Sequence, residues 1–267
     1  MTKPSTKLQK PARPTQSSWL QRITGLFRES PPVPAAPAKA KTHRGATVPT
    51  KAESAELPPF PGLSAERILV PRTKAECEAA AHAILTAGVA GFDTESRPTF
   101  KAGEKSGGPH VVQFALTDRA FIFQLHRREC ALIVARLIES DQVLKVGFGL
   151  KNDHGQIRHR LGVKLHPVID LDQIFRKRGH RNQIGVRGAM AEVLRLSFPK
   201  SKSTTTSNWA TAELNPRQLS YAANDAFAAL KIMEALHLNP ADFSGNRRQR
   251  TDSVGRVRAR PPSARAE

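Results

Sequence analysis

The sequence VAGFDTE at residues 89–95 directs the interpretation of the whole chain, because a short apolar run passes directly into two acids. Valine and phenylalanine favour strands, and side chains two positions apart on a strand point to the same face. We therefore expect a strand whose end presents Asp93 and Glu95 side by side. An Ala-rich helix over residues 74–85, ended by Gly88, is predicted to precede it.

A β-hairpin is predicted after this strand. Residues 111–116 (VVQFAL) and 120–125 (AFIFQL) are rich in strand-forming residues and are separated only by Thr-Asp-Arg. Alternating elements follow: a helix over residues 129–139, a strand over 144–148, a helix over 152–161 and a strand over 168–171. A hairpin followed by strand–helix alternation predicts an α/β fold, in which helices flank a mixed sheet.

Composition excludes several classes of protein. The chain has 267 residues, with 42 Lys+Arg against 23 Asp+Glu, which gives a net charge of +19. No apolar run approaches the ~20 residues that cross a bilayer, so we expect no membrane span. The two cysteines, Cys77 and Cys130, are too few for a disulfide framework or a Cys-rich zinc site. We interpret them as buried free thiols in a reducing compartment and expect a cytoplasmic protein.

Both ends of the chain are interpreted as disordered basic tails. Residues 1–62 form a Pro-rich tail, residues 63–240 the folded domain, and residues 241–267 an Arg-rich tail with seven arginines. Such tails attract polyanions without sequence preference, although a purely solubilising role is the alternative. Within the first tail, residues 17–28 show a short helical apolar stripe. This segment either docks on a protein partner or a membrane surface, or it is a transient helix with no partner.

The last helix of the domain has a clear start. Asn215 suits the N-cap and Pro216 the first helical position. Tyr221 and Asp225 follow four residues apart, so both side chains project from one face of this helix.

Four acids lie at the edges of the predicted elements: Asp93, Glu95, Asp153 and Asp225. If the sheet brings them together, they repel one another unless cations neutralise them. Mg²⁺ or Mn²⁺ suits oxygen ligands, and two such ions about 4 Å apart can promote displacement at a phosphodiester. Taken singly, these signals have simpler explanations: Asp-x-Glu is usually a solvated strand end, and Tyr-x-x-x-Asp a packed tyrosine with a surface acid.

Three stretches resemble the motifs of the DEDDy class of 3′-5′ exonucleases: GFDTE at residues 91–95, KVGFGLKND at 145–153 and YAANDA at 221–226. The similarity is greatest to ribonuclease D and to the exonuclease domain of the Werner syndrome helicase. It covers residues 65–240, and Gln113 and the Ser-Asn-Trp at residues 207–209 add to it. The resemblance implies a ribonuclease H-like (DnaQ-like) fold and removal of nucleoside 5′-monophosphates from the 3′ end of DNA or RNA.

The resemblance also implies the residues that hold the metal. Asp93, Glu95 and Asp225 would hold one Mg²⁺ or Mn²⁺ ion. Asp93 and Asp153 would hold the second.

Two further residues acquire roles by the same resemblance. Tyr221 would orient the attacking water, and the backbone at Thr94 would contact the substrate end. The sister class carries a histidine where this chain has Ser220, which favours the tyrosine version. The alternative is a catalytically weak or inactive nucleic-acid-binding protein on the same fold.

Overall fold

The structure is a computed structural model in which residues 48–99, 107–199 and 202–243 are described. The chain divides into residues 1–43 and residues 44–267, and all that follows concerns the second unit. The segment at residues 17–28 and most of both predicted tails lie outside the described residues. Among the described helices, none combines the length and apolar character needed to cross a membrane.

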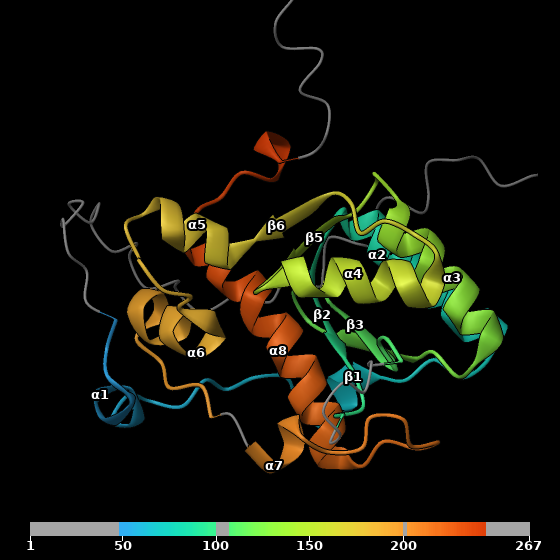
Figure 1. Ribbon diagram of the computed structural model, residues 1–267, viewed down its shortest axis with the longest axis horizontal. Helices are drawn as coiled ribbons and strands as arrows, with labels where there is room; N and C mark the ends of the chain where they lie inside the picture. The colour runs from blue at the N-terminus through green and yellow to red at the C-terminus, as the bar shows by residue number, and fades with distance from the viewer. Residues whose placement is uncertain (1–47, 100–106, 200–201, 244–267) are drawn as a thin grey trace, which may run out of the picture. The chain divides into compact units, whose positions relative to one another are not determined.

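A six-stranded mixed sheet forms the centre of the domain, in the order β1-β4-β3-β2-β5-β6 (Figure 1). Strands β2, β3 and β4 pair antiparallel, whereas β2, β5 and β6 run parallel, and β1 runs parallel to β4. The strands are β1 (Ile68–Leu69), β2 (Val89–Glu95), β3 (Val111–Ala115), β4 (Ala120–Gln124), β5 (Leu144–Gly147) and β6 (Val168–Asp170). The mixed sheet predicted from the sequence is confirmed, and the two-residue β1 is an addition too short to show a periodicity.

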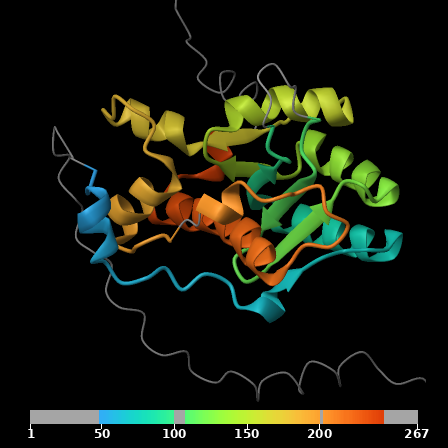
Figure 2. The same ribbon diagram turned by 60° about the horizontal axis from the view of Figure 1, so that its bottom comes forward.

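Helices cover both faces of the sheet (Figure 2). Side chains of α2, α3 and α4 form one apolar cluster with the sheet, and α8 packs with α5 and α6 on the opposite face. The helices are α1 (Lys51–Ala55), α2 (Lys74–Ala87), α3 (Arg128–Glu139), α4 (Leu150–Leu161), α5 (Leu171–Lys177), α6 (Gly185–Ala189), α7 (Lys202–Thr205) and α8 (Pro216–Ala235). Single turns at η2 (Ala65–Arg67) and η4 (Pro240–Asp242) and the π-helical η3 (Met190–Leu194) complete the domain.

Helix ends follow the capping residues of the sequence. Asn215 is the N-cap of helix α8, and its side chain accepts a hydrogen bond from the Gln218 backbone in a capping box. Pro216 occupies the first helical position. Helix α4 begins at Leu150, two residues before the predicted start, because Gly149 in the left-handed region turns the chain directly out of β5.

The close approach of α8 to β2 depends on one glycine. A Cβ atom built on Gly91 would lie 1.9 Å from the carbonyl oxygen of Ala226. Ala222, Ala223 and Ala226 are fully buried, and their small side chains let the helix lie close to the strands. Gly91 therefore sets the distance between the strand that carries Asp93 and the helix that carries Asp225.

Structured residues precede the predicted domain boundary at residue 62. Residues 51–55 form α1, and the ring of Phe60 packs 5.7 Å from Phe198 and 5.8 Å from Phe227, measured between centroids. The backbone of Leu63 donates to the Asn224 side chain at 2.8 Å. A few apolar and polar contacts thus fix a stretch whose proline content is typical of a linker.

The interpretation of the cysteines is also corrected. Cys77 of α2 and Cys130 of α3 are buried, as expected, but they are joined in a disulfide. The two residues are 53 positions apart, so the bond links two helices on the same face of the sheet. Spacing alone does not reveal such a pair, because the fold brings the two cysteines together.

We predict that Gly91→Ala destabilises the domain by more than about 3 kcal/mol, because the added methyl meets backbone rather than a movable side chain. Gly155→Ala is the matched control. A Cβ there meets nothing within 4 Å, so the same change should stabilise the exposed middle of α4 by about 0.5–1 kcal/mol. Urea unfolding measures both, and equal stability of the two variants would contradict the close packing of α8 on β2.

Candidate active site

Three acids converge where β2 ends beneath α8. Asp93 and Glu95 project from the same face of β2, and Asp225 comes from the middle of α8. One carboxylate oxygen from each lies within 4.8 Å of the others. Asp225 is only 6% exposed, so part of this negative charge is withdrawn from water.

The fourth predicted acid, Asp153, reaches the same place from α4. Strands β2 and β5 are parallel neighbours, so their carboxyl ends share one edge of the sheet, and α4 starts at that edge. Asp93, Asp153 and Asp225 line one pocket of about 290 Å³. The structure therefore brings together all four acids that the sequence singled out.

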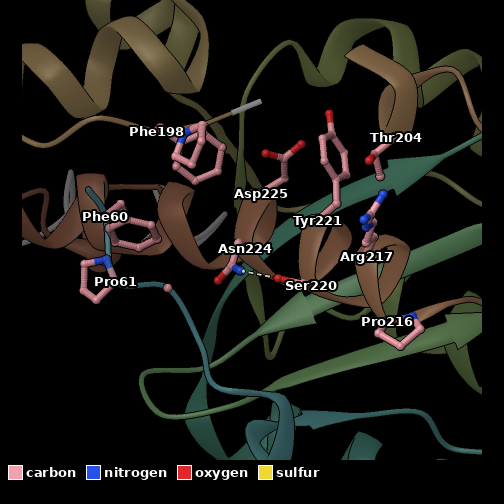
Figure 3. Close-up of a pocket in the computed structure, with 12 residues that line it drawn as sticks. Phe60, Pro61, Phe198, Thr204, Pro216, Arg217, Ser220, Tyr221, Asn224 and Asp225 are labelled. Carbon is pink, nitrogen blue, oxygen red and sulfur yellow. Dashed lines mark hydrogen bonds between the residues drawn. The ribbon is translucent and has the colours of Figure 1, made fainter. Parts of the chain in front are cut away.

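Tyr221 lies one helical turn before Asp225, and both side chains rise in the same direction from α8 (Figure 3). They border a second pocket of about 620 Å³, whose wall also includes the rings of Phe60 and Phe198. The Tyr221 hydroxyl lies 3.0 Å from the Thr205 hydroxyl of α7. This hydrogen bond with Thr205 restricts where the Tyr221 hydroxyl oxygen can lie.

Thr94 occupies the other face of β2. Its hydroxyl donates to the Asp153 carboxylate at 2.5 Å, which links β2 to the start of α4. The sequence placed Thr94 at the substrate through its backbone, and that role stays a prediction. The side-chain bond to Asp153 was not foreseen, because it depends on how α4 docks against the strand.

Burial affects the protonation of two acids that line this pocket. Burial raises the pKa of Asp153 to about 6, with the nearby Asp170 acting in the same direction and the Thr94 hydrogen bond opposing it. Burial also raises the pKa of Asp172, which lines the same pocket. Burial of carboxylates in this way disfavours their charged form, and a bound cation favours it.

Asp170 and Asp172 are the residues of this region that sequence reasoning missed. One Asp170 oxygen accepts from the backbone of Gly149 and of Asp172, and Asp172 accepts from the backbone of Gly185. These bonds fix the turn before α4 and the start of α6 around the pocket. The signal was present, since Asp170 lies at the end of a predicted strand and Asp172 directly after it, much as Asp93 and Glu95 lie at the end of another.

The donor set fits a hard divalent cation. All the converging groups are carboxylates, and oxygen ligands of this kind suit Mg²⁺ and Mn²⁺. Of the two ligand groups predicted from the sequence, Asp93, Glu95 and Asp225 have carboxylate oxygens within 4.8 Å of one another. Asp93 and Asp153, the other group, line one pocket.

The fold and the converging acids define the class: a ribonuclease H-like exonuclease fold with an acidic centre at the end of its central strand. A model of the 3′-5′ exonuclease family matches residues 69–239. That match exceeds half of the 267 residues, so the chain belongs to this family.

Individual relatives are also named as 3′-5′ exonucleases. A 3′-5′ exonuclease of Arabidopsis thaliana is 27% identical over 158 residues, which cover 58% of this chain and 55% of that protein. The mouse bifunctional 3′-5′ exonuclease/ATP-dependent helicase WRN is 28% identical over 55% of this chain and 11% of its own length. The match therefore covers about half the length of the Arabidopsis protein and a much smaller part of mouse WRN.

Solved structures agree on the fold. The Nibbler EXO domain of Aedes aegypti aligns with a TM-score of 0.57 and 22% identity, covering 67% of this chain and 94% of that one. Trypanosoma brucei RNase D, in complex with RNA U12, aligns with a TM-score of 0.57 and 21% identity over 64% of this chain and 62% of its own. At this level of identity the likeness supports the fold alone.

We predict that Asp153→Asn stabilises the cation-free protein at pH 8. The folded-state pKa of about 6 lies above the ordinary value of 3.8, so stability from this group is full below about pH 4 and is lost as pH rises through about 6. The asparagine carries no charge to bury, and its gain at pH 8 is about 1–3 kcal/mol. Urea unfolding in EDTA from pH 4 to 8 measures the difference, and a less stable variant at pH 8 would contradict it.

Proposed function

We propose that this protein is a two-metal 3′-5′ exonuclease that hydrolyses phosphodiester bonds from the 3′ end of DNA or RNA and releases nucleoside 5′-monophosphates. The observation that carries the proposal is the convergence of Asp93, Glu95 and Asp225 within 4.8 Å, with Asp153 lining the same pocket. The family match to 3′-5′ exonucleases supports the same reaction.

Asp93, Glu95 and Asp225 would hold one Mg²⁺ or Mn²⁺ ion, and Asp93 with Asp153 the other. When bound, such ions activate a water for in-line attack and stabilise the leaving 3′ oxygen. The carboxylates supply the negative charge that holds these ions and fix their places relative to the substrate. Asp153 must give up its proton to serve as a ligand, so its raised pKa makes the site weaker in acid.

Tyr221 is the candidate for orienting the attacking water. Its hydroxyl is positioned by Thr205, and its ring packs 5.9 Å from the buried Trp209. A phenol held in this way can accept a hydrogen bond from the water and help to move its proton. The adjoining pocket of about 620 Å³ is large enough for a nucleotide.

The charge of the chain suits a polyanionic substrate. Residues 1–47 contain nine Lys+Arg and one acid. Such charge increases the capture of nucleic acid without reading its sequence, and its effect weakens as salt rises. The proposed cytoplasmic location and a protein partner for residues 17–28 stay predictions.

The proposed function predicts a ladder of products. With Mg²⁺ or Mn²⁺, a 5′-labelled oligonucleotide should shorten stepwise from its 3′ end, and EDTA should stop the reaction because the acids lose their cations. A comparison of three substrates in one gel identifies the preferred one: single-stranded DNA, recessed duplex DNA and RNA.

Asp93→Asn is the informative variant for this assay, because Asp93 belongs to both proposed ligand sets. It should lower the rate by more than about 10³-fold, with the fold intact by circular dichroism. Binding of nucleic acid without turnover by the natural chain would instead favour the alternative of an inactive binding protein.

Removal of residues 1–47 should weaken binding at moderate salt and leave kcat unchanged. The cut precedes α1 and Phe60, so the described domain keeps its contacts. Measured against salt concentration, the Kd of the truncated protein should have a shallower slope than that of the full chain. Equal slopes would show that this segment contributes no charge to binding.

A further inference from the structure

Gln113 is a buried glutamine whose amide has no hydrogen-bond partner among the described residues. It lies in the middle of β3 with no exposed surface. Both its Nε2 and its Oε1 atoms are buried and make no hydrogen bond within the described residues. Its neighbours on the same strand face, Val111 and Ala115, belong to the apolar cluster beneath α8.

Such an arrangement is unfavourable by itself. Most buried polar side chains in folded proteins have a partner, and a buried amide without one lowers the stability of the fold. Methionine has a similar length and would fill the same space without that penalty. The amide of Gln113 therefore needs a partner that the described part of the folded chain does not provide.

The register of the sheet identifies the neighbour of this amide. Gln113 stands directly opposite Asp93 in the antiparallel pair of β3 with β2, whereas Val111 stands opposite Glu95. Directly opposed residues project from the same face of a sheet, with Cβ atoms about 4.5–5.5 Å apart. The amide of Gln113 therefore lies beside Asp93, which belongs to both proposed ion sites, and not beside Glu95.

We propose that Gln113 is a positioning residue for Asp93, donating a hydrogen bond to its carboxylate, directly or through one water, in the cation-loaded enzyme. This inference rests on the proposed function. The bond holds the Asp93 carboxylate in the orientation that serves both ions, and it gives the buried Nε2 of Gln113 an acceptor. Removing partners of this kind typically weakens metal affinity about 10–100-fold.

Gln113→Met tests the proposal, with Gln124→Met as the matched control. Gln124 is also buried, on the neighbouring strand β4, but its Nε2 donates to the carbonyl oxygens of Thr211 and Ala212 at 3.2 and 3.1 Å. Calorimetric titration of the full chain with Mn²⁺, without nucleic acid, gives the affinity. Thermal melting in EDTA gives the stability of the fold.

We expect Gln113→Met to melt no lower than the natural chain and to bind Mn²⁺ at least about tenfold more weakly. Gln124→Met should melt lower and keep its Mn²⁺ affinity. An affinity of Gln113→Met within twofold of the natural chain would overturn the proposal, as would a lowered melting temperature with unchanged affinity. If Gln113→Met does not fold, Gln113→Leu is judged by the same criteria.

The outcome also separates this inference from the proposed function. If the natural chain binds no Mn²⁺, or Asp93→Asn binds it equally well, the proposed metal site fails and the role of Gln113 fails with it. If Asp93→Asn abolishes binding while Gln113→Met leaves it unchanged, only the role of Gln113 is refuted.

Discussion

The close packing of α8 on β2 at Gly91 is the constraint on which the site depends. There is no space for a side chain between that strand and the Ala226 carbonyl, so the helix lies directly over the strand. Asp225 is one residue before Ala226, and Asp93 is two residues beyond Gly91. The approach that buries the alanine face of α8 therefore also brings the carboxylates together, against their mutual repulsion.

Because the carboxylates that the fold brings together repel one another, they favour the binding of a cation. Apolar burial under α8 and in the clusters on both faces stabilises the domain, while the burial of Asp153, which raises its pKa, opposes its charged form. A site that is costly when empty gains the most from a ligand of opposite charge. The same reasoning accounts for Gln113, whose unsatisfied amide lies beside Asp93 rather than at a neutral position.

Much of the fold could be predicted from the sequence because its signals are local. The apolar run before Asp93, the hairpin pattern and the Asn215-Pro216 cap each fix an element within a few residues, and β2, β3, β4 and α8 form where expected. The features that were missed depend on contacts across the fold. Phe60 orders a proline-rich stretch by reaching two distant rings, and Cys77 meets Cys130 only because α2 and α3 pack together.

The convergence of the four acids around two cations can be tested with crystals soaked in Mn²⁺, through the anomalous scattering of the ion. We expect two peaks about 4 Å apart, one beside Asp93, Glu95 and Asp225 and the other beside Asp93 and Asp153. The absence of any peak among these carboxylates, or peaks only elsewhere on the protein, would contradict it.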